Sequence, residues 1–143
     1  MPAYFPSAKI LLAAIGDNLD GEPTERLSVS RGLLRYLVSL AVENAPFNDS
    51  VYRAMNPDIA QAVDKGSIDD IKRHWCVHGY FEGRKGYTHV IDEQWYLSVY
   101  ADVKQGIKAK QLRSASEHFQ QSGEQEWRAP DARSEPDVQR ARQ

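Results

Sequence analysis

Side chains capable of metal binding or acid–base chemistry gather within one short stretch of this sequence. His74 and His78 are four residues apart, so on a helix their imidazoles would face the same way. Zinc sites use that spacing, and Cys76, Glu82 or the more distant His89 could supply a third ligand. The pattern predicts, as one alternative, a small metal-dependent enzyme built on His74 and His78, with Glu82 as a further candidate metal ligand.

A changed copy of the same stretch weakens this metal-site interpretation. His74 is matched by His118, which follows 44 residues later, whereas His78 and Cys76 are not repeated. A histidine that both copies keep is better explained by a shared structural task, such as a hydrogen bond to backbone or carboxylate. We therefore predict no catalytic residue, no metal site and no cofactor.

The two copies extend well beyond the histidines. The first copy runs from Tyr52 to Arg84 and the second from Tyr96 to Arg128. Each position of the first copy is matched by the position 44 residues later, as Tyr52 is by Tyr96. A fixed period without gaps is typical of a structural unit repeated in tandem. The repeated positions to which we assign structural roles are Tyr52 and Tyr96, Asp58 and Asp102, His74 and His118, Gly79 and Gly123, and Arg84 and Arg128.

Glu82 and Arg84 could instead form a catalytic acid and an anion clamp. Their recurrence favours a simpler role, in which each arginine pairs with an aspartate of its own repeat. We expect Arg84 to pair with Asp58, and the second arginine with Asp102, so that the loop after one helix is tied to the start of another.

Aromatic side chains are concentrated in the middle of the chain, where they could form a binding surface. Tyr80, Phe81 and Tyr87 lie in the loop between the two copies, where burial is least certain. Exposed side by side, such rings would stack against sugar rings or pack against a protein partner. We predict a binding surface of Tyr80, Phe81, Tyr87 and Trp95, and a glycan-binding module is a further alternative.

Length and patterning indicate one helical domain. With 143 residues, of which 41% are hydrophobic and 27% charged, the chain can form one soluble domain with a real core. No stretch alternates apolar and polar residues with a period of two, so strands are not expected. We predict an all-α fold, one compact domain in which an N-terminal helix pair packs on two tandem helical repeats.

The predicted divisions of the chain follow the composition and the repeat. They are an N-terminal helical hairpin in residues 1–46, a first repeat in 47–86, a second repeat in 87–130, and a disordered tail in 131–143. The tail is polar and has almost nothing to bury.

The N-terminal hairpin has two predicted helices. One covers Ala8–Ile15 and ends at Gly16; the other covers Thr24–Asn44, with Thr24 as its cap. The apolar surface of Leu33–Val42 is wider than one buried face requires. Either the first helix covers the remaining side, or a homodimer forms through Leu33–Val42.

Within the first repeat, caps and stops are expected at specific residues. Asn56 should cap a helix that begins at Pro57, and Ser67 should cap a longer one. That longer helix should run to His78, where Gly79 would end it in the left-handed conformation.

Charge and hydropathy limit the partners and the cellular location that we expect. A formal net charge of −2 argues against binding to a phosphate backbone, so no nucleic-acid partner is expected. The apolar run Ile10–Ile15 is too short for a signal peptide, and Leu33–Val42 is about half of a membrane span. A single cysteine does not require an oxidising compartment, so we expect a cytoplasmic protein.

The repeat also resembles a known bacterial repeat of the pattern NPDV…HY/HF…G…EGR. The residues that carry the resemblance are NPDIAQAV…H…GYFEGR and then WYLSVYADV…SASEHF…G…EWR, within about residues 47–130. The second copy departs from the pattern at Tyr100-Ala101-Asp102 and at Glu126-Trp127-Arg128.

That repeat is found in or beside polysaccharide-biosynthesis glycosyltransferases, and in small proteins of surface-polysaccharide gene clusters. The resemblance implies a helical, non-catalytic module and no particular substrate. We accordingly expect a non-enzymatic interaction or adaptor module with a protein partner, associated with bacterial surface-polysaccharide synthesis.

Overall fold

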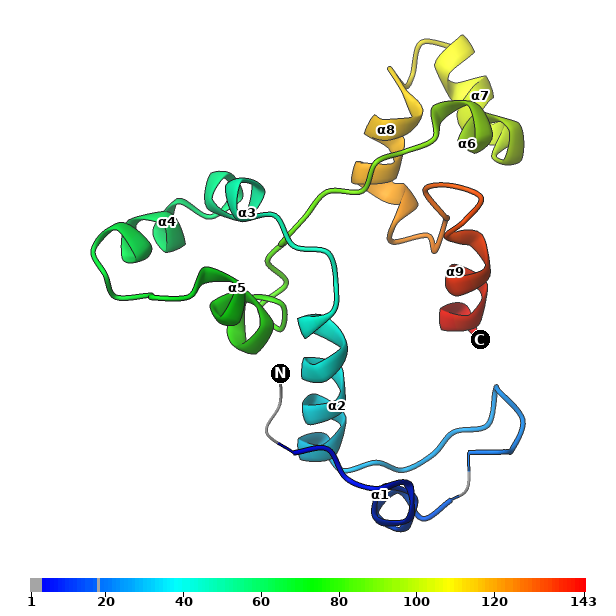
Figure 1. Cartoon of the computed structure of the whole chain (residues 1–143). Coiled ribbons are helices and arrows are strands. Elements are labelled where there is room, and N and C mark those ends of the chain that lie inside the picture. The colour runs from blue at the N-terminus through cyan, green and yellow to red at the C-terminus, as the bar shows by residue number, and fades with distance from the viewer. Residues whose placement is uncertain (1–3, 18) are drawn as a thin grey trace. The chain divides into compact units, whose positions relative to one another are not determined.

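The protein is helical throughout the part that the structure describes. The computed structural model describes residues 4–17 and 19–143, and these contain helices and no strands (Figure 1). The all-α prediction is therefore confirmed. None of the helices in these residues is long and apolar enough to cross a membrane.

The chain divides into two compact units where the sequence favoured one domain. The first unit is Met1–Thr88 and the second is His89–Gln143. The reason is that each unit has a hydrophobic core of its own. The first core is built around Tyr52, Ile59 and Trp75, and the second around Tyr96, Val103 and Phe119.

The helices of the two units correspond along the sequence. The first unit contains α1 (Ala8–Ile15), α2 (Arg31–Glu43), α3 (Asp49–Met55), α4 (Pro57–Asp64), α5 (Ile71–His74) and the π-helical turn η1 (Trp75–Gly79). The second contains α6 (Glu93–Val99), α7 (Ala101–Lys108), α8 (Ala115–His118), η2 (Phe119–Gly123) and α9 (Glu135–Arg142). From α3 to η1, each element has a counterpart with bounds 44 residues later.

The N-terminal helices agree only in part with their prediction. Helix α1 has the predicted bounds and ends at Gly16, whose φ of 78° is left-handed. The predicted start of α2 at Thr24 is wrong, because the helix begins after Ser30, whose Oγ accepts a hydrogen bond from the backbone N–H of Leu33. Leu27 lies outside the helix and is 40% exposed, so no buried contact favours extending the helix back to Thr24.

One side of α2 packs against other elements of the first unit, while another side stays exposed. Val42 is buried in the core, and Arg35 Nη2 donates a hydrogen bond of 3.1 Å to the carbonyl of Val77 in η1. Leu34, in contrast, is 53% exposed. The homodimer through Leu33–Val42 remains a prediction.

The caps of the first repeat differ from those expected. Helix α4 begins at Pro57 with Asn56 at its N-cap position, as expected, but the Asn56 side chain makes no cap bond. Its Nδ2 donates instead to the carbonyl of Tyr52, 2.8 Å away. Asp70, not Ser67, caps the next helix, because its Oδ1 accepts from the backbone N–H of Arg73 at 2.9 Å.

The prediction that Gly79 takes the left-handed conformation is also wrong. The left-handed glycine is Gly83, with φ of 77°. Bonds from the backbone N–H groups of Gly83 to Tyr80 and of Arg84 to Gly79, 3.0 and 2.8 Å long, form a Schellman motif around it. Gly79 is small for another reason, because a Cβ there would overlap the hydroxyl of Tyr52.

The C-terminal residues predicted to be disordered contain helix α9. Asp131 Oδ1 accepts a hydrogen bond of 2.8 Å from the backbone N–H of Ser134, just before the helix. The first turn of α9 carries acidic residues and Pro136, and its last turn carries arginines. This arrangement suits the helix dipole, a signal that the small apolar content of the segment does not carry.

Candidate functional site

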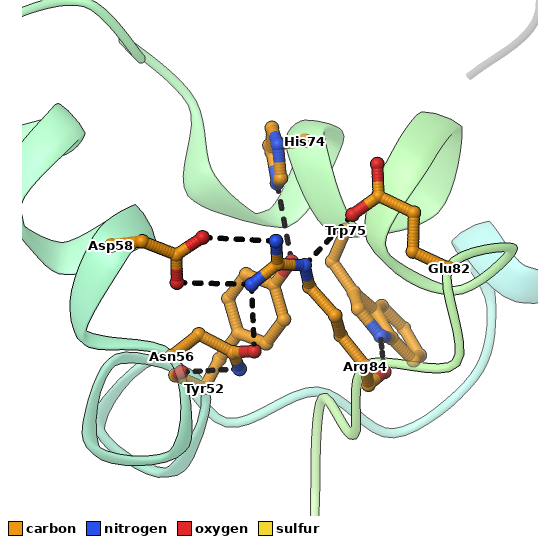
Figure 2. A network of polar contacts seen from close by, with 7 residues as sticks. All are labelled: Tyr52, Asn56, Asp58, His74, Trp75, Glu82 and Arg84. Carbon is orange, nitrogen blue, oxygen red and sulfur yellow. Dashed lines mark hydrogen bonds and ion pairs between the residues drawn. The ribbon is translucent and has the colours of Figure 1, made fainter.

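Arg84 is the centre of a polar network in the first unit (Figure 2). Its Nη1 and Nη2 bind the two carboxylate oxygens of Asp58 at 3.0 and 2.9 Å, and its Nε donates to Glu82 at 2.7 Å. Nη1 also donates to Oδ1 of Asn56 at 3.1 Å. The pairing expected between Arg84 and Asp58 is confirmed, and it joins the segment after η1 to the start of α4.

The second unit contains the same network with one exchange. Arg128 binds both oxygens of Asp102 at 2.9 and 2.7 Å, as expected, and Glu126 at 2.6 Å. Tyr100 stands where Asn56 stands in the first unit, and the guanidinium carbon of Arg128 lies 4.9 Å from the centre of its ring. A cation–π contact thus replaces a hydrogen bond at this position.

These networks shift the pKa values of their acids. The bond from Arg128 lowers the pKa of Asp102 to about 2, and the bonds from Arg84 lower those of Asp58 and Glu82. Carboxylates held in this state are poor proton donors at neutral pH. The arrangement therefore suits fixing geometry rather than general acid catalysis.

A tyrosine–histidine pair lies beside each arginine network. The hydroxyl of Tyr52 is 3.2 Å from Nδ1 of His74, and the hydroxyl of Tyr96 is 3.0 Å from Nδ1 of His118. Burial lowers the pKa of His74 and raises that of Tyr52, while it raises the pKa of Tyr96 to about 12. In the first unit, burial thus favours the neutral forms of both Tyr52 and His74.

A π-helical turn follows each of these histidines. Backbone bonds from Tyr80 to Trp75 and from Glu124 to Phe119 span five residues instead of four, with lengths of 2.8 and 3.2 Å. In the first unit, the indole N–H of Trp75 donates to the carbonyl of Arg84 at 2.9 Å. The wide turn thus connects the aromatic core to the arginine network.

The candidate metal ligands do not form a complete set. The rings of His74 and His78 lie 5.7 Å apart between centres, but residues 4–17 and 19–143 contain no group of three His, Cys, Asp or Glu that could hold a metal ion. Cys76 is buried, which raises the pKa of its thiol and disfavours the metal-binding thiolate. Glu82 is bonded to Arg84.

The structure brings together three of the four predicted binding aromatics. Tyr80 and Tyr87 both stand edge-on to the buried Trp75, at 5.8 and 6.2 Å between ring centres, and Phe81 stands edge-on to Tyr80 at 5.4 Å. Tyr80 is 44% exposed, whereas Phe81 and Tyr87 are half-buried. Trp95 belongs to the second unit, where it packs against Tyr100.

Arg35 from α2 completes this aromatic group. Its guanidinium carbon lies 3.9 Å from the centre of the Phe81 ring, in a cation–π contact. Neither Arg35 nor Asn56 is among the site residues predicted from the sequence. Asn56 of the first copy corresponds to Tyr100 of the second. This exchange could have indicated a position where the two copies differ in chemistry.

Comparisons of the chain with protein-family models, with curated proteins and with solved structures give no match. The site is therefore interpreted from its own geometry.

Proposed function

We propose that this protein is a non-enzymatic interaction module, an adaptor that acts with bacterial surface-polysaccharide synthesis machinery. The non-enzymatic part of this proposal is supported by one observation. The reactive side chains bind to one another within each unit. In each unit, a histidine pairs with a buried tyrosine, and an arginine binds one aspartate and one glutamate. The corresponding positions of the two units are 44 residues apart. Side chains that make the same contacts in both units are explained by a structural role.

The association with polysaccharide synthesis rests on the resemblance of residues 47–130 to the repeat that accompanies glycosyltransferases. A protein partner fits this assignment because adaptors act by contact, and the first unit offers exposed apolar side chains for it. Among these are Leu34, Val77 and Tyr80, which are 53%, 43% and 44% exposed.

Deletion and complementation would test the proposal in a bacterium that carries the gene. Deletion should lower the amount of surface polysaccharide, and the wild-type gene should restore it. The variants His78→Ala and Glu82→Gln should restore it as well, since both residues are exposed and the amide oxygen of the glutamine could still accept from Arg84. A folded His78→Ala protein that fails to complement would instead favour the metal-dependent enzyme, and an unchanged polysaccharide level would remove the association.

A second candidate, a glycan-binding module, is favoured by the exposure of Tyr80. This ring is fixed by edge-on contacts to Trp75 and Phe81, as a platform for a sugar ring requires. Titration of the chain with oligosaccharides of the cognate polysaccharide would test it, with Tyr80→Ala as the variant expected to lose binding. Binding that is equal in wild type and Tyr80→Ala would exclude this surface.

A further inference from the structure

Trp127 occupies a backbone conformation that tryptophan rarely adopts. Its φ is 56°, and backbone bonds from Trp127 to Glu124 and from Arg128 to Gly123, of 3.2 and 2.9 Å, place it in a Schellman motif. The same position of the first unit is Gly83, with φ of 77°. Glycine adopts this conformation freely, whereas a side chain with a Cβ is strained there.

Packing covers only about half of this side chain. Trp127 is 51% exposed. Within the residues that the structure describes, its indole makes no ring contact, cation–π contact or hydrogen bond. A large apolar side chain that is both strained and exposed destabilises the fold, and such strain is concentrated at functional positions.

The turn that carries the indole is fixed on both sides. Arg128 Nε donates to Glu126 at 2.6 Å, and the rest of its guanidinium holds Asp102. The neighbours of Trp127 are therefore bonded to each other and to the start of α7. An exposed tryptophan on a rigid turn loses little conformational entropy on binding, which is a property of interface hot spots.

The charges around the indole identify the chemistry of its partner. Glu124 and Glu126 flank it on the same exposed turn, and residues 114–127 contain no lysine or arginine. Arg128 carries one positive charge against the two carboxylates that it binds, Asp102 and Glu126, and Oε1 of Glu124 lies 3.9 Å from Nε2 of His89. The turn therefore keeps an excess of negative charge. A negative surface around an exposed indole face attracts a cation.

We propose that Trp127 is the anchor of a partner-binding surface on the second unit, and that the partner protein presents a lysine or arginine side chain to the indole. Glu124 and Glu126 supply the complementary negative charge. This inference rests on the proposed function as an interaction module and adds the position and chemistry of one contact.

Lys110 supplies a matched control in the same unit. Its φ is 58° at a Schellman motif, and its counterpart in the first unit is Gly66, with φ of 71°. Lys110 is exposed and charged, so its side chain is satisfied by water. Lys110→Gly relieves the same backbone strain as Trp127→Gly without removing an aromatic ring.

Titration of the full chain with hexalysine, followed by the NMR signals of the indole N–H groups, tests the cation contact. We expect a saturable shift of the Trp127 signal that weakens at high salt. Trp127→Gly should bind hexalysine at least roughly tenfold more weakly, because the carboxylates alone remain. Lys110→Gly should bind as wild type does.

Hexaglutamate and cellohexaose serve as comparison probes. No shift with hexalysine, or equal hexalysine affinity in Trp127→Gly, would overturn the proposal. A shift of the Trp127 signal with cellohexaose in place of hexalysine would overturn it in favour of a sugar platform. None of these outcomes depends on whether the partner belongs to polysaccharide synthesis, so this result and the deletion phenotype can fail separately.

Thermal unfolding of the same variants tests the strain argument. Trp127→Gly and Lys110→Gly should both melt at a higher temperature than wild type, because glycine relieves the left-handed conformation in each. A lower melting temperature for Trp127→Gly alone would show that the indole stabilises the fold, and would overturn its assignment to binding.

Discussion

The hydroxyl of Tyr96 lies 3.0 Å from Nδ1 of His118, and both residues are buried in the second unit. The corresponding pair of the first unit, Tyr52 and His74, is 3.2 Å apart, but His74 is only half-buried. Loss of a partner costs more where water cannot replace it. The two copies of one contact should therefore differ in their contribution to stability.

Substitution of these histidines should show this difference. We expect His118→Ala to lower the free energy of unfolding by on the order of 1–3 kcal/mol, because it leaves a buried hydroxyl without a partner and a cavity beside Tyr96. His74→Ala should cost less, since water can reach the hydroxyl of Tyr52. Denaturant unfolding, with NMR signals assigned to each unit, measures both, and a larger loss for His74→Ala would contradict the interpretation.

The helical fold could be predicted from the sequence because the repeat doubles each signal. Tyr52 and Tyr96, or Trp75 and Phe119, are apolar at matching positions, and all four are buried. The predicted start of α2 is misplaced because the apolar Leu27 suggests a longer helix. Whether that leucine finds a buried partner depends on tertiary packing, which local patterning does not contain.

The ion pairs of the site were predictable for the same reason, whereas the turns were not. Arg84 and Asp58 have oppositely charged side chains that recur together, so pairing was a direct inference. The π-helical turns shift the left-handed residue from Gly79 to Gly83, and no local propensity announces a π turn. The sequence marks Trp127 as a departure from the repeat pattern, whereas the strain at this residue is visible only in the backbone angles.

The two glycines Gly79 and Gly83 should respond to alanine for different reasons. At Gly79 a Cβ would overlap the hydroxyl of Tyr52, so Gly79→Ala should displace a buried ring and cost about 1–3 kcal/mol. At Gly83 nothing lies within 4 Å of the added Cβ, and the cost is only that of the left-handed backbone, about 1 kcal/mol.

A double-mutant cycle separates the two effects. Tyr52→Phe removes the hydroxyl that the Cβ would meet, so it should recover part of the loss in Gly79→Ala and none of that in Gly83→Ala. Equal recovery in both, measured by denaturant unfolding, would show that Tyr52 does not set the requirement for glycine.

Lysine should not replace the central arginines. An ammonium group cannot bind both oxygens of Asp102 and also Glu126, so Arg128→Lys should lower the free energy of unfolding by on the order of 1 kcal/mol. Arg84→Lys should likewise lose the bidentate pair with Asp58, together with the hydrogen bond to Asn56. Arg140→Lys is the control, since the Arg140 side chain is 79% exposed and its Nη1 lies 3.7 Å from Asp137. A loss in this control equal to that of Arg128→Lys would contradict the interpretation, because the effect would then not depend on the bidentate pair with Asp102.

Acid should weaken the second unit through Asp102. The bond from Arg128 depresses the pKa of Asp102 to about 2 in the folded state, below its ordinary value of 3.8. The folded state therefore binds the proton less readily than the unfolded state does. The stability that the pair contributes is present above pH 3.8 and is lost as the pH falls through about 2.

The variant Asp102→Asn isolates this contribution. It should be less stable than wild type at neutral pH, because it cannot form the ion pair, and the difference between the two proteins should shrink as the pH falls from about 4 to about 2. Melting of the second unit, followed by its NMR signals across this range, measures the difference. Because the carboxylate of Asp102 is 63% exposed, the effect should also decrease at high salt. A stability difference that stays constant with pH would mean that Asp102 titrates at its ordinary pKa and that its bond to Arg128 is not maintained in solution.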